Sequence, residues 1–314
     1  MELYKQGVNS FLYEYKLNNI MDVSIIIVNY NTKALTNECI NSIIEQTKQI
    51  TFEIILVDNN SIDGSIDFFS NDSRIKFIQA GSNLGFGKAN NLGLKYAIGK
   101  YIFFLNSDTY LTSNSIKKLF DFAEKHIELN IGELGVLLLD KNGNYNVPFS
   151  VLPSLNIFRN VMRHLKLTND NSDIVINNIK RIGYAEVGFV CGADVFVPRI
   201  VLDKIGGAFD SNFFMFCEEI DMAKRMEISG YKRIIINDTG IIHYGASSFD
   251  MSKMTFRRYQ MMTESVILYH KKYDSWFTYK LFIIYRLILA YRDMLKLSFS
   301  YKEMKLIFNM ILKG

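Results

Sequence analysis

The sequence contains little cysteine and little proline. Its three cysteines, Cys39, Cys191 and Cys217, are too far apart for a CxxC metal pair, and an odd number suits no disulfide framework. We therefore expect small buried thiols. Three prolines in 314 residues leave no stretch that resembles a stiff linker. A composition of 49% hydrophobic and 22% charged residues excludes disordered and collagen-like chains and favours one large globular domain or two closely packed ones.

Long uninterrupted apolar runs are also absent near both ends of the chain. Glu2, Lys5, Glu14 and Lys16 fall where a secretion signal would need apolar residues, so we expect a cytoplasmic protein. Near the other end, charged residues interrupt every apolar run before the ~20 residues that a transmembrane helix requires.

Charge is unevenly distributed along the chain. Residues 251–314 contain 12 lysines and arginines but only 4 acidic residues, a balance of +8, whereas the whole chain carries +4. A basic C-terminal part on an acidic body predicts contact with something anionic, such as phospholipid headgroups or nucleic acid.

From Trp276 onward the sequence has the spacing of an amphipathic helix. The pattern predicts a helix that lies either on the protein's own body or on a membrane interface, because an apolar stripe suits a bilayer or a protein groove better than a nucleic acid backbone. The predicted stripe is Ile283, Ile284, Leu287, Ile288, Tyr291, Met294 and Leu295, and Arg286, Arg292, Asp293 and Lys296 gather on the opposite side.

The first 250 residues alternate short β-branched runs with helical patterns, which predicts an α/β fold with a mainly parallel sheet. Ligands of such sheets bind beyond the carboxyl ends of the strands, and here several of those ends are polar. The less regular middle at 142–185 suggests loops around one or two short helices. We expect strands at 23–28, 53–57, 74–78, 101–105, 135–139 and 187–197, a strand pair within 233–243, and helices at 35–46, 87–98, 113–125 and 218–229.

Two strand ends carry residues suited to a nucleotide. Asp58 closes the second strand, where its carboxylate could accept hydrogen bonds from a ribose or a base, or could form an Asx turn. Tyr30 follows the first strand between two asparagines. The loop at 83–91, NLGFGKANN, opens a helix with glycines and Lys88, an arrangement that attracts phosphate without being a dinucleotide fingerprint.

Two further strand ends suggest a divalent metal. The fourth strand leads into the triplet NSD, whose Asp108 offers an oxygen ligand for Mg²⁺ or Mn²⁺ or caps the following helix. His243 ends a strand before a Gly/Ser loop and is either a hydrogen-bonded core histidine or a metal ligand.

Three carboxylates follow an aromatic block at the start of the helix at 218–229. Glu218, Glu219 and Asp221 repel one another, so at least one must be solvated, paired or partly protonated, and Asp221 can pair with Arg225 four residues on. The group is either an acidic first turn that complements the helix dipole or contains a general base with a tuned pKa.

Taken in order, these motifs resemble the family 2 inverting glycosyltransferases, and in particular their rhamnosyltransferase-like branch. The resemblance runs from about residue 22 to about residue 270, and no single motif carries it alone. The segments are VSIIIVNYN, EIILVDNNSIDGS, NLGFGKANN, FFLNSDT, GADVFVPR, GGAFDSNFFMFCEEIDMAKR, GYKR and HYGASS.

The resemblance implies a GT-A fold, with a Rossmann-like, mainly parallel sheet flanked by helices. Together with the amphipathic pattern, it divides the chain into an N-terminal extension at 1–21, a glycosyltransferase domain at 22–270 and a basic helical tail at 271–314. Within the domain, residues 22–140 would bind the nucleotide-sugar and residues 141–270 the acceptor.

The resemblance also implies a role for each site residue. Glu219 falls where the family places its catalytic base, while Asp108, the last member of the D-x-D motif, and His243 would hold Mg²⁺ or Mn²⁺ at the diphosphate. The nucleotide-sugar would contact Tyr30, Asp58, Asn60, Asn83, Gly85, Lys88, Asn91 and Asn106, and the acceptor would contact Gly192, Ala193, Glu218 and Asp221.

The implied reaction moves a sugar to a hydroxyl of a saccharide acceptor with inversion. dTDP-rhamnose is the favoured donor, and UDP-linked hexoses or N-acetylhexosamines are the alternative. We expect a role in cell-surface polysaccharide, O-antigen or capsule synthesis, an acceptor that can be linked to polyprenyl diphosphate, and peripheral contact of the tail with the inner face of the cell membrane. Nucleic acid is not an expected partner.

Two rival functions remain at this stage. A nucleotidyltransferase would carry a glycine-rich phosphate loop, which IVNYNTKA at 27–34 lacks. A degenerate, non-catalytic transferase-like protein is supported only by Asn106, which replaces the first acid of the D-x-D triplet, whereas Asp108, Glu219 and His243 count against it.

Overall fold

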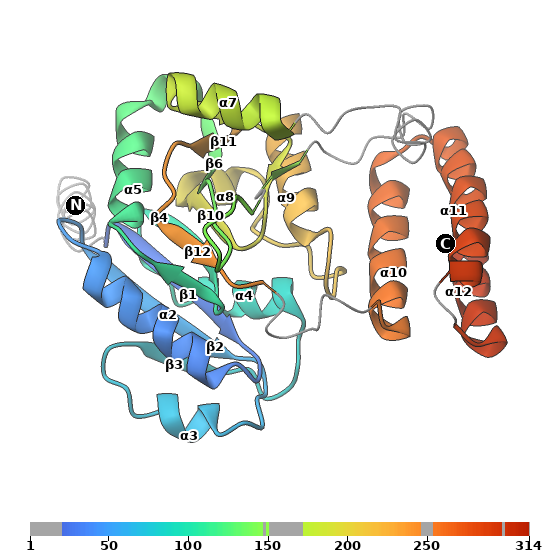
Figure 1. The fold of residues 1–314 in the computed structure, drawn as a ribbon, viewed down its shortest axis with the longest axis horizontal. Coiled ribbons are helices and arrows are strands. Elements are labelled where there is room, and N and C mark those ends of the chain that lie inside the picture. Colours follow the sequence, from blue (N-terminus) through green and yellow to red (C-terminus); the bar gives the residue numbers. More distant parts are fainter. Residues whose placement is uncertain (1–20, 147–148, 151–171, 246–253, 297–298, 314) are drawn as a thin grey trace, which may run out of the picture.

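The computed structural model describes residues 21–146, 149–150, 172–245, 254–296 and 299–313. They form an α/β body followed by three C-terminal helices at one end of the molecule (Figure 1). The predicted extension at 1–21 lies almost wholly outside the described residues.

An eight-stranded sheet forms the centre of the body. Six strands run in one direction, and β10 and β8 run against their neighbours, so the sheet is mainly parallel, as predicted. In spatial order the strands are β3 (Lys76–Gln79), β2 (Phe52–Asp58), β1 (Val23–Asn29), β4 (Tyr101–Asn106), β10 (Asp194–Pro198), β6 (Ile131–Val136), β11 (Lys232–Ile236) and β8 (Tyr184–Glu186).

One strand prediction is wrong in position. The strand expected at 135–139 lies at Ile131–Val136, because the chain buries Glu133 inside it. The Oε1 atom of Glu133 accepts a hydrogen bond from the backbone N–H of Val190 at 2.8 Å, which satisfies part of the buried carboxyl.

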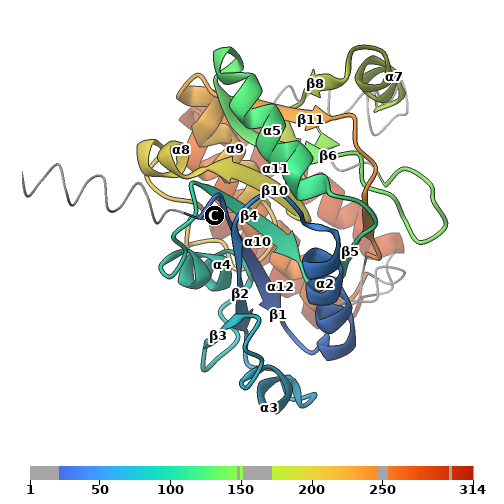
Figure 2. The same cartoon turned by 90° about the vertical axis from the view of Figure 1, so that its left-hand side faces the viewer.

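Helices cover both faces of the sheet (Figure 2). Alternate strand residues belong to the two separate apolar clusters on these faces. Ile25 and Ile27 of β1 pack with α2 and α5, whereas Ile26 packs with α4, α7, α8 and α9 on the other face. At Gly93 of α4 an added Cβ would lie only 2.7 Å from Cγ2 of Ile26, so this helix lies very close to the sheet. The helices are α2 (Lys33–Gln46), α3 (Ser65–Phe69), α4 (Phe86–Leu94), α5 (Ser115–Lys125), α7 (Ser172–Ile182), α8 (Arg199–Lys204) and α9 (Glu218–Ile228), with a 3₁₀ turn at Ile127–Leu129.

Two small antiparallel ribbons lie beside the main sheet. β5 (Thr109–Leu111) pairs with β12 (Ile241–His243), and β7 (Phe149–Ser150) pairs with β9 (Phe189–Val190). The strands expected as a pair within 233–243 both form, but β12 pairs with β5 rather than with β11. This pairing brings the end of β12 to the end of β4.

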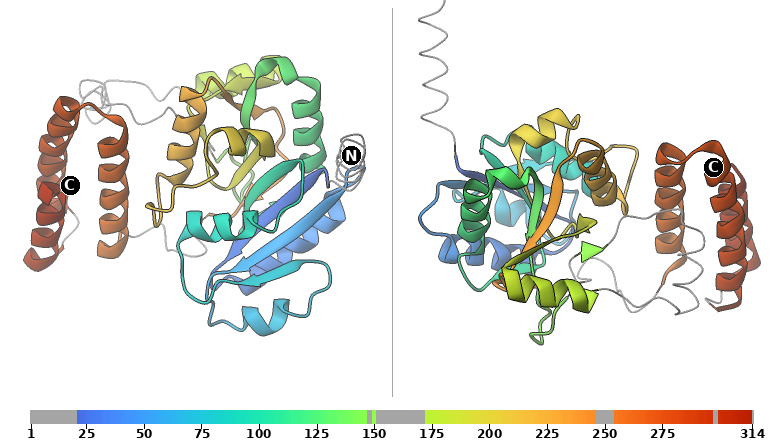
Figure 3. Two further views of the ribbon diagram at one scale, coloured as in Figure 1. Left: turned by 180° about the vertical axis from the view of Figure 1, so that it is seen from behind. Right: turned by 90° about the horizontal axis from the view of Figure 1, so that it is seen from above.

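The C-terminal part forms a bundle of three helices, α10 (Phe256–Tyr273), α11 (Trp276–Lys296) and α12 (Tyr301–Lys313). Figure 3 shows the bundle standing at one end of the α/β body. It has its own apolar core, to which all three helices contribute. The first helix crosses the boundary that the sequence placed between residues 270 and 271.

Besides its apolar core residues, helix α11 turns two charged residues toward α10 and leaves other apolar residues exposed. Arg286 donates from Nη2 to Oγ1 of Thr263 at 2.8 Å, and Asp293 accepts from the hydroxyl of Tyr259 at 3.0 Å, so both charged residues face α10. Part of the predicted apolar stripe, including Ile284 and Ile288, is exposed to solvent. Within the described part of the chain, no helix combines the length and apolarity needed to cross a membrane.

Candidate active site

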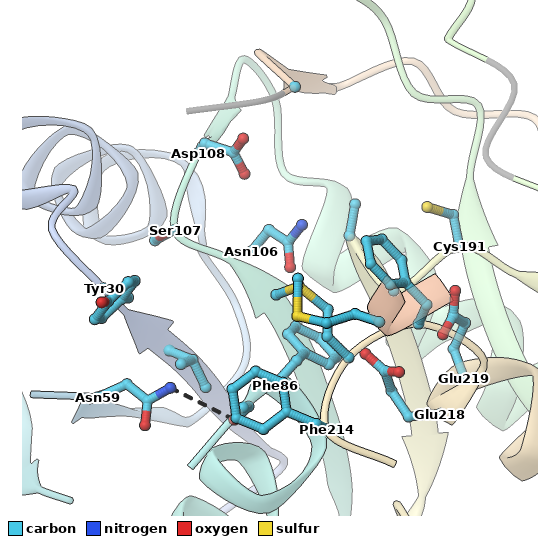
Figure 4. Close-up of a pocket in the computed structure, with 18 of the residues that line it drawn as sticks. Tyr30, Asn59, Phe86, Asn106, Ser107, Asp108, Cys191, Phe214, Glu218 and Glu219 are labelled. Atoms are coloured by element: carbon cyan, nitrogen blue, oxygen red, sulfur yellow. Dashed lines mark hydrogen bonds between the residues drawn. The ribbon is translucent and has the colours of Figure 1, made fainter. Parts of the chain in front are cut away.

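A cavity of about 570 Å³ opens at the carboxyl ends of β1 and β4, beside the first residues of α9. Figure 4 shows Tyr30 and Asn59 on one side, Glu218 and Glu219 on the other, and Asn106 between them. The predicted site residues that line it are Tyr30, Asn83, Gly85, Asn106, Asp108, Gly192, Ala193, Glu218, Glu219 and His243, whereas Asp58, Asn60, Lys88, Asn91 and Asp221 do not.

The first side of the cavity is held by hydrogen bonds between loops. Asn59 donates from Nδ2 to Oδ1 of Asn83 at 3.1 Å, and its own Oδ1 accepts from the N–H of Leu84 at 2.8 Å. The same Oδ1 of Asn83 accepts from the N–H of Gly85 at 3.0 Å. These bonds shape the loop before α4 and fix the wall to which Tyr30 also belongs.

Gly85 is required by this packing. Its φ angle is +80°, and an added Cβ would lie 2.1 Å from the carbonyl oxygen of Phe214. The N–H of Phe86 donates to that same oxygen at 3.1 Å. The predicted glycine loop therefore meets the segment that leads into α9, and one of the first N–H groups of α4 is used by the protein itself.

Asp58 is fully buried and does not form part of the cavity wall. Its Oδ2 accepts from Nδ2 of Asn29 at 2.7 Å, and its Oδ1 accepts from the N–H of Ser61 at 2.9 Å. These bonds hold the ends of β1 and β2 together, in agreement with the turn interpretation. Contact between Asp58 and a nucleotide stays a prediction.

Three other predicted nucleotide contacts also lie away from the wall. Asn60 is exposed with a φ angle of +69°, and Lys88 is exposed on α4. Asn91 donates from Nδ2 to the carbonyl of Phe209 at 2.6 Å and accepts from its N–H at 3.1 Å. Asn91 therefore ties α4 to the segment before α9, and the ligand contacts of all three residues stay predictions.

Asp108 and His243 are brought together by the β5–β12 ribbon, in which His243 pairs with Thr109. Nε2 of His243 lies 3.3 Å from Oδ1 of Asp108 and 3.5 Å from Nδ2 of Asn106. Nδ1 of His243 lies 3.3 Å from Nδ2 of Asn146. Both ring nitrogens are therefore oriented by neighbours, as is usual for a functional histidine.

The donor set fits a divalent cation that takes most of its ligands from a substrate. Among the residues that the structure describes, no group of three or more His, Cys, Asp or Glu side chains could hold a metal by itself. Mg²⁺ and Mn²⁺ often bind one or two protein groups and complete their shell with phosphate oxygens and water. Asp108 is not the N-cap residue of the following helix, since that position is held by Asn114.

Glu218 and Glu219 follow a strained turn at the start of α9. Phe216 and Cys217 have φ angles of 72° and 64°, values that side chains of this size rarely adopt and that cluster at functional sites. Glu218 is 4% exposed, and its Oε2 has no hydrogen-bond partner among the described residues.

Burial raises the pKa of both carboxyl groups above the ordinary glutamate value, and the charge of Glu219 raises the pKa of Glu218 further. A carboxylate whose pKa is raised toward the working pH is a stronger base than an ordinary one. The pair is therefore suited to accept a proton from a group bound in the cavity.

Asp221 lies away from the cavity wall, and its predicted contact with an acceptor stays a prediction. Asp221 is fully buried, and its Oδ2 accepts from Nε of Arg225 at 2.9 Å, which confirms the predicted pair. Its Oδ1 accepts from Nζ of Lys272 at 2.5 Å and from the hydroxyl of Tyr273 at 2.7 Å. Because two positions on a helix differ by about 200°, Asp221 faces α10 while Glu219 lines the cavity.

The cavity wall also includes residues that sequence reasoning did not select. Asn59 stands one position after Asp58 in the same polar segment, so the strand-end argument was enough to find it. The pair Arg257–Arg258 and Met261 come from α10, and their only sequence signal was the local excess of positive charge.

Residues 24–175 match the family model described as glycosyl transferase family 2. An uncharacterized glycosyltransferase of Haemophilus influenzae is 33% identical over 129 residues, which cover 40% of this chain and 51% of the relative. An N-acetylglucosaminyl-diphospho-decaprenol L-rhamnosyltransferase of Mycobacterium tuberculosis is 25% identical over 214 residues, which cover 62% of this chain and 67% of the relative. The chain therefore spans about half to two thirds of the length of these relatives.

The fold is similar to that of TarS from Staphylococcus aureus, with a TM-score of 0.52 and 18% identity over 93% of this chain and 71% of the TarS 1–349 chain. A further TarS structure, in complex with UDP-GlcNAc, gives a TM-score of 0.52 and 19% identity over 79% of this chain and 66% of that chain. The shared architecture is the mainly parallel sheet flanked by helices that the sequence predicts.

Proposed function

Since residues 24–175 of this chain form a glycosyl transferase family 2 domain, we propose that the protein transfers a sugar from a nucleoside-diphosphate sugar to a hydroxyl of a saccharide acceptor. The product would be a cell-surface glycan. The observation that carries the proposal is that one cavity contains both the Glu218–Glu219 pair and the Asp108–His243 pair.

In this proposal Glu219 is the general base. Its carboxylate accepts the proton of the acceptor hydroxyl while that oxygen attacks the anomeric carbon from the face opposite the leaving diphosphate, so the configuration inverts. The raised pKa of Glu219 supports the role, because proton transfer is most effective when the base titrates close to the working pH. Glu218, buried beside it, has a pKa raised by burial and by the charge of Glu219 and so favours its protonated form.

Asp108 and His243 would hold Mg²⁺ or Mn²⁺ beside the diphosphate. A bound cation would neutralise the negative charge that develops on the leaving nucleoside diphosphate. Asn146 lies next to the second ring nitrogen of His243, at 3.3 Å, and so fixes the orientation of the ring. Asn106 lines the cavity where a second acid would stand in the D-x-D motif.

dTDP-rhamnose is the donor that we favour, because one relative is a rhamnosyltransferase. UDP-linked sugars are the alternative, since the structurally similar TarS has been solved with UDP-GlcNAc. The test is a thermal-shift panel of dTDP-rhamnose, UDP-glucose, UDP-galactose, UDP-N-acetylglucosamine and GDP-mannose, each with and without Mg²⁺ or Mn²⁺. A ligand at 100-fold its dissociation constant stabilises a protein by about 2.7 kcal/mol, which such an assay detects readily.

A metal-dependent rise in Tm with one donor, followed by transfer or slow hydrolysis of that donor, would support the proposal. Absence of any shift with every donor would contradict it and favour a non-catalytic, transferase-like binding protein.

We also propose that the helical bundle rests on the inner face of the cell membrane, where a polyprenyl-linked acceptor would be presented. Phe277, Ile284, Ile288 and Tyr291 form one stripe of α11 and are 64%, 55%, 62% and 58% exposed. The exposed Lys280 lies beside this stripe. An apolar stripe flanked by cations binds anionic bilayers, and the relative from Mycobacterium tuberculosis takes a decaprenol-linked acceptor by its description.

Sedimentation with phosphatidylcholine vesicles containing or lacking phosphatidylglycerol tests this contact. We expect Ile284→Asn with Ile288→Asn to reduce binding to the anionic vesicles several-fold without lowering Tm, because both side chains are exposed. The matched control is Ile182→Asn with Ile228→Asn, which changes two exposed isoleucines of the α/β body. Equal vesicle binding by both double variants would contradict the proposal.

A further inference from the structure

The first turn of α10 carries two arginines that line the cavity, Arg257 and Arg258. Arg258 is only 8% exposed, and its Nε is buried without a hydrogen-bond partner among the described residues. Arg257 is exposed at the cavity side of the same turn. Two guanidinium groups therefore belong to a pocket whose function, as proposed above, did not require them.

An arginine that is withdrawn from water without an acidic partner is expensive, so its retention needs a reason. Across the described part of the chain, neither Arg257 nor Arg258 lies within ion-pair distance of a carboxylate. Guanidinium groups match the geometry of phosphate oxygens and bind them in pairs. The arrangement therefore suits a phosphate-bearing ligand that enters the cavity.

Helix α10, which carries the arginines, is attached to the segment that leads into the carboxyl pair. Ser265 of α10 donates from Oγ to the carbonyl of Met215 at 2.7 Å, and Tyr269 packs against Phe213 and Cys217. Helix α10 is thus fixed on the segment directly before Glu218. The Asp108–His243 pair, in contrast, comes from the ends of β4 and β12.

The cavity that the arginines line also has apolar wall residues. Phe214, Met215, Phe216 and Met261 line it, and Met261 stands about one turn after Arg257 and Arg258 on α10. Methionine and aromatic side chains accommodate flexible apolar groups, so the wall combines a cationic and an apolar element.

We propose that Arg257 and Arg258 bind the diphosphate of a lipid-linked acceptor, with the neighbouring Met and Phe side chains contacting the first part of the lipid. This inference rests on the proposed function and deepens it, because it assigns the acceptor's anionic group to the bundle. The donor diphosphate would be held separately, at Asp108 and His243. The bundle would then contribute in two ways: α10 would provide part of the acceptor site, and α11 would provide the exposed apolar stripe.

The experiment uses the full chain and farnesyl diphosphate as a soluble probe of a lipid diphosphate. Calorimetry measures its binding in the presence of saturating UDP or dTDP with Mg²⁺, so that the donor site is already filled. We expect Arg257→Gln with Arg258→Gln to weaken farnesyl diphosphate binding at least 10-fold and to change nucleoside-diphosphate affinity less than 2-fold. Lys271→Gln, which removes a positive charge from the exposed side of α10, is the matched control and should change neither affinity.

Three results would overturn the inference. One is an equal loss of nucleoside-diphosphate and farnesyl diphosphate binding, which would assign the arginines to the donor. Another is unchanged farnesyl diphosphate binding in a variant with the Tm of the wild type. The third is that inorganic pyrophosphate binds as tightly as farnesyl diphosphate, which would show that the lipid part contributes nothing to binding.

The failure of the proposed function looks different. If the wild type binds no nucleoside diphosphate, the glycosyltransfer proposal is contradicted, while farnesyl diphosphate titrations without nucleotide still decide whether the arginines bind a lipid diphosphate. Arg258→Lys, which keeps the charge but loses the fork of donors, should give an intermediate affinity.

Discussion

Glu219 and Asp221 lie two residues apart on α9, yet they belong to different regions of the molecule. Glu219 lines the cavity, and burial raises the pKa of its carboxyl group. Asp221 is fully buried on the other side of the helix and binds Arg225, Lys272 and Tyr273. Glu219 forms no ion pair with any described residue and can accept a proton, whereas Asp221 is paired with two cations and holds two parts of the chain together.

Helix α9 therefore belongs to two regions of the molecule at once. Its first turn carries the candidate base, and the same turn is the point where α10 is attached to the α/β body. Because Ser265 and Tyr269 also contact the segment before Glu218, the bundle fixes the approach to the cavity. A change on the bundle side should therefore alter the cavity side through α9, but by less than a change in the cavity itself.

Replacing the cavity carboxylate should have the largest effect. Glu219→Gln keeps the size of the side chain but removes the base, so we expect transfer to fall 10²- to 10⁴-fold, the usual contribution of a general base. Nucleotide-sugar binding should stay within about 2-fold of the wild type. Activity of the wild type should rise with pH as Glu219 loses its proton, with a midpoint above the ordinary glutamate value because its pKa is raised.

Glu218→Gln is the matched control, since it makes the same chemical change one residue away. We expect a loss of transfer of about 10-fold or less, because this carboxylate is only a neighbour of the base. If Glu219→Gln weakened donor binding as much as transfer, its assignment as the base would be wrong.

The second prediction concerns the bundle side of the helix. Asp221→Asn leaves Lys272 and Arg225 without their buried partner, and loss of one member of a buried ion pair costs about 3 kcal/mol of unfolding free energy. Urea unfolding measures this loss by circular dichroism for the whole chain and by fluorescence for the bundle, because Trp276 in α11 is the single tryptophan. Transfer at a temperature where the variant is folded should fall less than 10-fold.

Asp210→Asn is the matched control for Asp221→Asn. It removes the other carboxylate that contacts Lys272, at 2.7 Å, but leaves Asp221 with all its partners. We expect a much smaller loss of stability, because the Asp210 side chain is 20% exposed and Lys272 is 31% exposed. Equal losses of stability in the two variants would mean that Asp221 contributes no more to the contact between α9 and α10 than the partly exposed Asp210 does.

Glu133 is a third buried carboxyl group. It does not line the cavity, and it forms no ion pair with any described residue. Burial raises its pKa from 4.5 to about 8. Between these values the folded protein holds a proton that the unfolded chain releases, so this group makes the protein less stable as pH rises from 4.5 to 8. Glu133→Gln removes the titration, and its stability relative to the wild type should be higher at pH 8 than at pH 5 by about 3 kcal/mol.

Urea unfolding at the two pH values measures this difference directly. The same relative stability at pH 5 and pH 8 would show that Glu133 is ionised in the folded protein. The surroundings of Glu133 would then stabilise its charge, as the partners of Asp221 do, and would differ from those of Glu219, whose pKa is raised by burial.

The sequence predicts the sheet well where strand character is local. The β-branched segment at 23–28 and the aromatic, apolar segment at 101–105 form β1 and β4 almost residue for residue. The segment IGELGV did not look like a strand, because glycine and glutamate have low strand propensity and only the surrounding core makes this strand form. Local patterns carry no information about such tertiary burial.

The same limit applies to the site. Strand ends identified Tyr30, Asn83 and Asp108, because parallel strands bring their carboxyl ends to one edge. The acidic cluster of α9 could not be divided between the cavity and the bundle, since that depends on where α10 packs, some 50 residues later in the chain. Arg257 and Arg258 were missed for the same reason.

The smallest expected effect comes from a change that affects only the contact between α9 and α10 at Asp221. Tyr273→Phe removes one hydrogen bond to Oδ1 of Asp221, originally 2.7 Å long, and leaves the contacts with Lys272 and Arg225 in place. We expect a loss of about 1 kcal/mol in unfolding free energy and no change in transfer, because a carboxylate with two remaining cations stays fully paired. Denaturant titration and a transfer assay on the same preparation measure both quantities. If transfer fell as far as in Asp221→Asn while stability hardly changed, the position of α9 would depend on the tyrosine contact itself, and the bundle side of the helix could no longer be treated as a passive support for Glu219.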